Sequence, residues 1–229
     1  MYMKTIPRFF KPPESSYFLF GPRGTGKSTF LRQHYSEAEW IDLLDPEKFR
    51  IYSARPERII ELVRKTKNRI KTFIIDEIQL VPGLLSAVHL LIEEDKECKF
   101  VLTGSSARKL KRTGIDLLAG RAVVKTMHSF MMSELENQYA LDAALNQGMV
   151  PLIAAADDPH EILRSYIGIY LQEEVKQEGL VRNLGDFSRF LEIVSFSHGA
   201  EINTSNIARE CSVGRKAVES YLSILQDLL

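Results

Sequence analysis

The stretch Tyr17-Phe-Leu-Phe-Gly-Pro-Arg-Gly-Thr-Gly-Lys-Ser-Thr29 decides the fold of this chain. A short apolar run passes straight into glycines, a lysine and two hydroxyl residues, which predicts a buried strand, a tight loop and the first turn of a helix. Gly21, Gly24 and Gly26 let the backbone curl so that successive N–H groups point into one concavity, and the helix N-terminus adds its positive end. A concavity of this kind binds phosphate.

The pattern Gly-x-x-x-x-Gly-Lys-Ser/Thr is complete at Gly21, Gly26, Lys27 and Ser28. A glycine-rich turn that happens to precede a lysine is the simpler alternative, but the flanking strand and helix favour the phosphate-binding motif. In that motif Lys27 reaches the β- and γ-phosphates of a nucleoside triphosphate, and the Ser28 hydroxyl binds the accompanying Mg²⁺. We expect the whole loop to contact the nucleotide, through Gly21, Pro22, Arg23, Gly24, Thr25, Gly26, Lys27, Ser28 and Thr29.

The composition is that of an ordinary globular protein of 229 residues, with 45% hydrophobic and 26% charged residues. Thirty basic residues balance thirty acidic ones, so the net charge favours no class of partner. Cys98 and Cys211 have no paired spacing and are expected to be reduced, buried thiols without a disulfide or a metal. No run has signal-peptide character or transmembrane length, which predicts a cytoplasmic protein without membrane contact.

Strands alternate with amphipathic helices through the first 130 residues. This alternation predicts an α/β fold, a P-loop core with a five-stranded, mostly parallel sheet and helices on both faces. After the strand that ends at Phe20, the apolar runs expected to form strands are 39–43, 72–77, 98–103 and 121–126.

The strand pattern stops after about residue 130. Helices are expected over 133–146, 159–178 and 186–197, and from Thr204 onward two short helices joined by the turn 211–214 form a helix-turn-helix. We therefore divide the chain into a P-loop core (1–130), a helical region (131–197) and a winged-helix-like segment (198–229). That last segment is expected to be truncated, because the sequence ends directly after its second helix.

Two acids end the strand at 72–77. Asp76 follows Lys27 by 49 positions, enough for one strand-and-helix excursion before the chain returns beside the phosphate loop. There Asp76 can hold Mg²⁺ directly or through water, and Glu77 can act as the base that polarises a water for attack on the γ-phosphate. An Asp-Glu pair after a strand is by itself more often a helix cap or a solvated turn, so the phosphate loop decides in favour of catalysis.

Three further residues have two interpretations each. Ser105 or Ser106, at the end of the fourth strand, binds the γ-phosphate or the attacking water, or else caps the next helix. Arg121, just before the fifth strand, stabilises transition-state charge at the nucleotide of a neighbouring subunit, or else forms a surface salt bridge.

The C-terminal helix pair suggests DNA contact through Ser212, Arg215, Lys216 and Ser220. Residues 195–229 contain three basic and four acidic side chains, a poor balance for neutralising DNA phosphates. Packing or contact with a protein client is therefore the first expectation for this segment. The alternative is a DNA-binding protein in which ATP acts mainly as a conformational switch.

Several segments together resemble a family of prokaryotic AAA-class ATPases that carry a C-terminal domain of unknown function. The resemblance implies an ATP- and Mg²⁺-dependent ATPase, with Lys27 on phosphate, Ser28 and Asp76 on Mg²⁺, Glu77 as base and a serine at 105 or 106 as sensor. Arg121 is a matching position, and assembly into a homo-oligomer is an open expectation. The segments are Gly21–Ser28, Ile74–Gln79, Leu102–Leu110, Leu118–Arg121, Gly148–Pro151, Tyr166–Glu174 and Thr204–Leu225.

This chain departs from the family in two places. Met127 to Phe130 replaces a stretch that contains leucine and proline. The sequence also stops before the large C-terminal domain that the family implies, so we expect a fragment or a shortened member. ATP is preferred over GTP, both by the resemblance and because the chain contains no Asn-Lys-x-Asp tetrapeptide.

Overall fold

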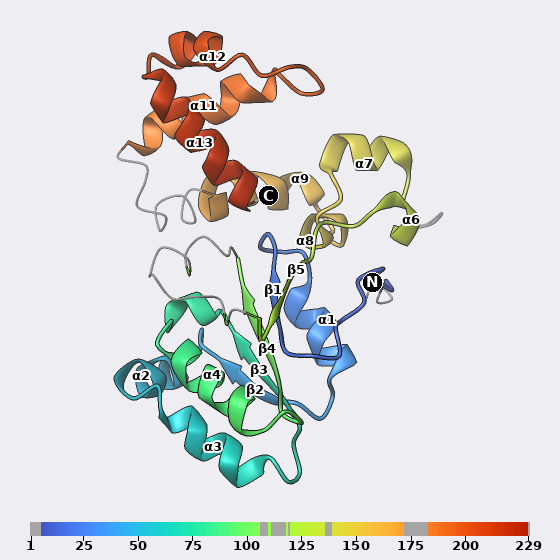
Figure 1. Cartoon of the computed structure of the whole chain (residues 1–229). Coiled ribbons are helices and arrows are strands. Elements are labelled where there is room, and N and C mark those ends of the chain that lie inside the picture. Colours follow the sequence, from blue (N-terminus) through green and yellow to red (C-terminus); the bar gives the residue numbers. More distant parts are fainter. Residues whose placement is uncertain are drawn as a thin grey trace. The chain divides into compact units, whose positions relative to one another are not determined.

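The structure is a computed structural model that describes residues 6–105, 110, 118, 120–135, 139–171 and 183–228 (Figure 1). The chain forms two compact units, which we call unit 1 (Met1–Pro159) and unit 2 (His160–Leu229). The three-part division expected from the sequence stays a prediction.

Unit 1 is built on a five-stranded sheet in which every neighbouring pair of strands is parallel. The predicted α/β class and the five strands are therefore confirmed. The strand order is β2-β3-β4-β1-β5. The strands are β1 (Tyr17–Phe20), β2 (Glu39–Asp42), β3 (Thr72–Asp76), β4 (Lys99–Gly104) and β5 (Val123–Thr126).

The strand order shows how the acids reach the loop. β3, which ends in Asp76, does not adjoin β1, because β4 lies between them. Between α1 (Lys27–His34) and β3 the chain forms β2 and two helices. The acids therefore approach the loop across β4, which makes the end of β4 part of the site.

Helices cover both faces of the sheet, as expected for parallel strands (Figure 1). Side chains alternate along each strand, so Phe18, Phe73 and Phe100 pack in one core cluster with residues of three helices. Tyr17 and Ile74 point to the opposite face and pack in the cluster that contains Leu31 of α1. The three helices are α2 (Pro46–Ala54), α3 (Arg58–Thr66) and α4 (Leu84–Glu94).

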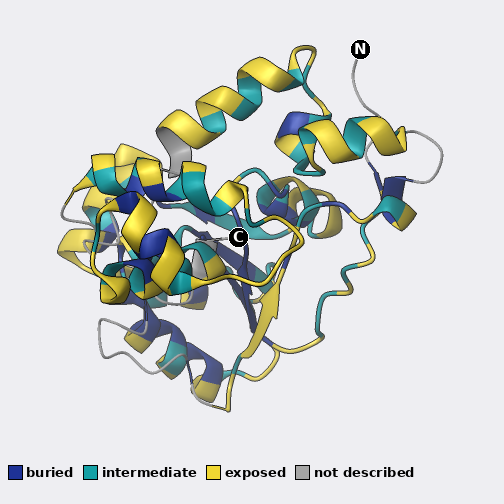
Figure 2. Cartoon of the chain, turned by 90° about the horizontal axis from the view of Figure 1, so that it is seen from above, coloured by how far each residue is buried: buried dark blue, intermediate teal, exposed yellow. Residues whose placement is uncertain are grey.

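Burial falls off toward one edge of the sheet. All four residues of β1 are buried, whereas all four of β5 are exposed, as Figure 2 shows by colour. The strand that leads into the phosphate loop thus lies inside the sheet, between β4 and β5. The loop therefore begins at the end of a fully buried strand.

Local signals set the ends of several elements. The Asp45 carboxylate accepts a hydrogen bond of 2.8 Å from the Glu47 N–H and caps α2, whose first residue is Pro46. The sequence expects one helix over 133–146. The described residues instead form α6 (Met132–Leu135) and α7 (Leu141–Gln147), so that prediction is wrong. Unit 1 continues through α8 (Pro151–Ala154) toward α9 (Pro159–Ser165).

Unit 2 contains the predicted helix-turn-helix. α12 (Thr204–Cys211) and α13 (Arg215–Leu228) are joined by a tight turn at Ser212, whose φ is 57°. Both pack on α11 (Leu184–Ser195) around Phe187, Phe190 and Tyr221. No strand follows among residues 183–228, so a wing stays a prediction. Residues Tyr166–Leu171 form a π-helical turn.

Cys98 and Cys211 are both buried, as the sequence indicates. They belong to different units. None of the helices in the described part of the chain has the length and apolar character needed to cross a bilayer.

We predict that Phe73→Ala destabilises unit 1 by about 3–5 kcal/mol, because Phe73 is fully buried and its ring stacks on Phe100 at 5.5 Å. Urea unfolding followed by the fluorescence of Trp40, the single tryptophan, measures this. Phe196→Ala is the matched control, because Phe196 is 83% exposed. Equal shifts in the two variants would contradict the assigned core.

Candidate functional site

The predicted loop joins β1 to α1 at the carboxyl end of the sheet. Gly24 and Gly26 have φ angles of 81° and 85°, a region that favours glycine, and Gly26 precedes the first residue of α1. At Gly21 a Cβ atom would lie 2.1 Å from the backbone oxygen of Met127, so no larger residue fits there. The backbone curl expected from the three glycines is confirmed.

Lys27 is buried and lies across the loop. Its Nζ donates hydrogen bonds to the carbonyl oxygens of Gly21 and Pro22, at 2.7 Å and 3.0 Å. The hydroxyl of the fully buried Thr25 also donates to the Pro22 oxygen, at 2.8 Å. The ammonium group thus lies within the loop, where the sequence expects it to meet phosphate.

Ser28 and Asp76 are brought together across β4. The Ser28 hydroxyl donates to one carboxylate oxygen of Asp76 at 2.9 Å. The Thr103 hydroxyl, at the end of β4, donates to the other oxygen and accepts a bond of 3.1 Å from the Glu77 N–H. Thr103 was missed by sequence reasoning, although a polar residue near the end of a buried strand, directly before Gly104, is a usable signal.

Glu77 has a left-handed backbone, with φ of 61°, and follows Asp76 at the end of β3. A non-glycine residue in this region costs about 1–3 kcal/mol and is enriched at active sites. The Gln79 side-chain amide donates to the Glu77 carboxylate. Gln79 is held close to β4, because a Cβ at Gly104 would lie 2.6 Å from its Oε1. Gln79 was also missed by sequence reasoning.

The other predicted residues lie as follows. Ser105 is buried directly after β4, while Ser106 lies outside the described residues. The Arg121 guanidinium forms an ion pair with Glu93 of α4 in the same chain, which also lowers the pKa of that carboxyl. The sensor role of the serines and the role of Arg121 at a neighbouring subunit stay predictions.

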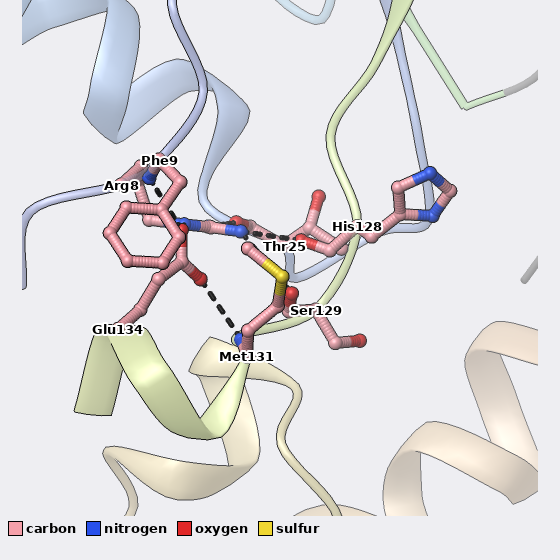
Figure 3. Close-up of polar contacts among 7 residues, drawn as sticks. All are labelled: Arg8, Phe9, Thr25, His128, Ser129, Met131 and Glu134. Atoms are coloured by element: carbon pink, nitrogen blue, oxygen red, sulfur yellow. Dashed lines mark hydrogen bonds and ion pairs between the residues drawn. The ribbon is translucent and has the colours of Figure 1, made fainter. Parts of the chain in front are cut away.

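A buried ion pair lies on the outer side of the loop (Figure 3). The Arg8 Nε is 3.1 Å from the Glu134 carboxylate, and the two side chains are 9% and 2% exposed. Arg8 also donates to the Thr25 carbonyl oxygen at 2.8 Å and to the His128 carbonyl oxygen at 2.6 Å. Its guanidinium lies 4.8 Å from the centre of the Phe130 ring. Sequence reasoning missed this pair, whose members are 126 positions apart.

A cavity of about 370 Å³ opens beside the loop. Its walls are mostly apolar, and they come from the N-terminal arm, α1, the segment after β5 and α8. Figure 1 shows these parts of unit 1 around the upper end of the sheet. The lining residues include Ile6, Arg8, Gly24, Thr29, Phe30, Phe130 and Leu152.

The four residues predicted to contact DNA lie at the start of the second helix of the pair or near it. Ser212 forms the turn, and Arg215 forms an ion pair of 3.0 Å with Glu219 on its own helix. Lys216 is exposed and Ser220 is half-buried on the same helix. The structure brings them to one end of α13, and DNA contact stays a prediction.

The polar groups at the phosphate loop are of the kind that binds a phosphate together with a hard cation such as Mg²⁺. The Ser28 hydroxyl and the Asp76 carboxylate supply oxygen ligands of the kind that Mg²⁺ prefers, within 2.9 Å of each other. In the described part of the chain no three His, Cys, Asp or Glu side chains form a metal cluster.

Two family models match the chain, and together they span most of it. A model described as an AAA domain matches residues 14–136. A model described as a domain of unknown function (DUF8612) matches residues 138–229. No curated protein matches the chain in sequence.

Solved structures are similar at low sequence identity. Domain III of the Thermotoga maritima replication initiation protein DnaA is 13% identical, with a TM-score of 0.35 over 71% of this chain and 78% of that one. DnaA bound to AMPPCP and single-stranded DNA is 11% identical, with a TM-score of 0.39 over 93% and 82%. A structure of katanin that describes its self-assembly is 16% identical, with a TM-score of 0.39 over 92% of this chain and 72% of that one.

We predict that Glu134→Gln reduces the loss of stability of unit 1 in acid. Burial raises the pKa of Glu134, but the N–H groups of Met131 and Phe9 and the Arg8 guanidinium outweigh it, so the pKa lies below its ordinary value. The carboxylate therefore contributes stability above the ordinary pKa of a Glu, and this contribution is lost as the pH falls toward the lower folded-state pKa.

Urea unfolding between about pH 6 and pH 3, followed by Trp40 fluorescence, checks this. The parent protein should lose more stability over this range than Glu134→Gln. Glu97→Gln is the control, because the Glu97 side chain is 76% exposed. An identical pH dependence in the parent and Glu134→Gln would show that Glu134 has no lowered pKa.

Proposed function

The chain belongs to the AAA-domain family, and from this we propose that it is an Mg²⁺-dependent ATPase that hydrolyses ATP to ADP and phosphate. The observation that carries the proposal is the hydrogen bond of 2.9 Å between Ser28 and Asp76. It places the hydroxyl of the phosphate loop and the acid at the end of β3 at one point, although they are 48 positions apart.

We propose that the triphosphate of ATP binds to the glycine loop of unit 1. The glycine loop and the N-terminus of α1 present backbone N–H groups, and Lys27 adds a positive charge. A bound phosphate gives the Lys27 ammonium a stronger acceptor than the carbonyls of Gly21 and Pro22, because its oxygens are charged. We therefore propose that Lys27 turns from these carbonyls to the β- and γ-phosphates.

The residues that would hold Mg²⁺ are Ser28 and Asp76, with Thr103 orienting the Asp76 carboxylate. When bound, the ion neutralises charge on the phosphate oxygens. Asp76 is buried, and both of its oxygens accept hydrogen bonds from hydroxyl groups. A hydroxyl can rotate away from the carboxylate, so this arrangement leaves Asp76 able to accept a cation or its water.

We propose Glu77 as the base. It accepts a proton from the attacking water while the water oxygen bonds to the γ-phosphorus and the bond to the ADP oxygen breaks. Its position at the end of β3, next to Asp76, supports this role. The Gln79 amide and the Thr103 hydroxyl hold its carboxylate and its N–H, respectively, and so fix where the side chain starts.

The cavity beside the loop is proposed to hold the base and ribose of ATP. Gly24, Gly26 and Thr29 line it, so it lies next to the proposed phosphate-binding site. Ile6 of the N-terminal arm lines it, so we propose that this arm packs over the base. Its volume of about 370 Å³ is within the usual range for ligand sites.

We further propose that nucleotide state is passed to the C-terminal region. α8 belongs to the part that matches the domain of unknown function, and its Leu152 N–H donates to the Gly24 carbonyl oxygen at 3.2 Å. A movement of the loop on binding phosphate would therefore also move α8 through this hydrogen bond. A DNA or protein client remains a proposal to be tested with the hydrolysis assay, as does self-assembly.

We predict that Lys27→Ala lowers the affinity for ATP and Mg²⁺ by at least about 100-fold. The reason is the loss of several charge-assisted hydrogen bonds to phosphate, each of about 1.5–3 kcal/mol. Isothermal calorimetry measures the affinity. Lys71→Ala is the control, because Lys71 forms only an exposed ion pair with Glu97 and should leave binding unchanged. Unaltered ATP binding by Lys27→Ala would refute the proposal that Lys27 binds the phosphates.

We predict that Glu77→Gln binds ATP normally but lowers its turnover by about 10²–10⁴-fold, the usual contribution of a general base. Phosphate release is measured against protein concentration, with and without duplex DNA, so that assembly and a DNA client are tested together. Glu94→Gln, a surface change on α4, is the control. Full turnover by Glu77→Gln would exclude it as the base.

A further inference from the structure

The Arg8 guanidinium joins the N-terminal arm to three other segments of unit 1 (Figure 3). It donates to the Glu134 carboxylate of α6, to the Thr25 carbonyl of the phosphate loop and to the His128 carbonyl after β5. A longer contact of 3.4 Å reaches the Ser129 carbonyl oxygen. No other type of side chain offers donors in so many directions within one plane.

Glu134 holds this guanidinium in place. Its carboxylate is 2% exposed and accepts from the Phe9 N–H at 2.7 Å and from the Met131 N–H at 3.0 Å, in addition to Arg8. A buried carboxylate with this many donors has few alternative positions. The arm that carries Arg8 is therefore fixed at two adjacent residues, since the backbone of Phe9 and the side chain of Arg8 bind the same acid.

The contact with Thr25 lies at a sensitive point of the loop. Thr25 stands between Gly24 and Gly26, whose φ angles are both positive and whose backbone has the widest freedom in the chain. The peptide bonds here are trans, so the N–H of Gly26 points opposite to the Thr25 carbonyl. When Arg8 binds this carbonyl oxygen, it also fixes the direction of the Gly26 N–H, which points to the opposite side of the peptide, away from Arg8.

We propose that Arg8 is a positioning residue for the phosphate site, holding the Thr25–Gly26 peptide in the orientation that presents its N–H to phosphate. Glu134 is its anchor. Because the same guanidinium binds the His128 carbonyl and the acid of α6, the loop's shape depends on the segment from residue 128 to residue 134. The inference rests on the proposed function, since it takes the loop to bind nucleotide.

The alternative is that Arg8 merely tethers the N-terminal arm. In that case its replacement lowers stability without changing the loop. Arg8→Lys separates the two roles, because a lysine keeps a positive charge beside Glu134 but has a single nitrogen. That nitrogen cannot serve Glu134, Thr25 and His128 in the geometry of the guanidinium fork.

The first measurement is amide hydrogen exchange without nucleotide. In Arg8→Lys the peptides covering residues 17–31 should exchange faster than in the parent protein, while peptides from β3 should not change. The second is the affinity for ADP with Mg²⁺ by calorimetry, which should fall about tenfold, the scale of one lost hydrogen bond from a charged donor. Glu134→Gln should produce the same two changes, since it weakens the anchor of Arg8.

Arg64→Lys is the matched control, because Arg64 forms an exposed ion pair with Glu94 on α3 and α4, away from the loop. It should leave exchange and affinity unchanged. Parent-like loop exchange and affinity in Arg8→Lys would overturn the inference, and if that variant does not fold, the same result in Glu134→Gln would do so. If the parent protein binds no ADP but the loop still exchanges faster in Arg8→Lys, the proposed function is refuted. The conclusion that Arg8 holds the loop in place would then still stand.

Discussion

The curled backbone between β1 and α1 needs hydrogen-bond donors on its outer side, and much of unit 1 is arranged to supply them. A loop whose N–H groups point inward turns its carbonyl oxygens outward, and buried carbonyls without partners cost about 1–3 kcal/mol each. Three of these donors come from outside the loop: the Leu152 N–H donates to the Gly24 carbonyl, the Arg8 guanidinium to that of Thr25, and the Met127 N–H to that of Phe20, just before the loop. Lys27 belongs to the loop itself and donates to the carbonyls of Gly21 and Pro22 from within it.

The strand order also shapes the site. β1 is paired on both sides, with β4 and β5, and all four of its residues are buried, so the loop that follows starts from a fixed point. β4 separates it from the acids, and Thr103 at the end of β4 fills the gap with a hydroxyl that contacts Asp76 and the Glu77 N–H. A threonine suits this place, because its hydroxyl can both donate and accept a hydrogen bond.

What could be predicted from the sequence was local. The phosphate loop, the strands, the Asp45 cap and the helix pair each depend on residues within a few positions of one another, and such patterns are visible in one sequence. Arg8 and Glu134 could not be paired, because no periodicity links residues 126 positions apart. The single helix expected over 133–146 was wrong for a related reason. Glu134 and Leu135 are buried by contacts with the N-terminal arm and its neighbours, and helical periodicity does not report such contacts.

The boundary between the two family regions does not coincide with the boundary between the compact units. The match to the AAA domain ends at residue 136, but unit 1 continues to Pro159. The reason lies at α8, where Pro151 has no N–H and the next N–H, that of Leu152, has no partner within the helix. That orphan donor meets the Gly24 carbonyl, an orphan acceptor of the loop. Each satisfies the other, so a chain cut at the family boundary would leave a loop carbonyl without its donor.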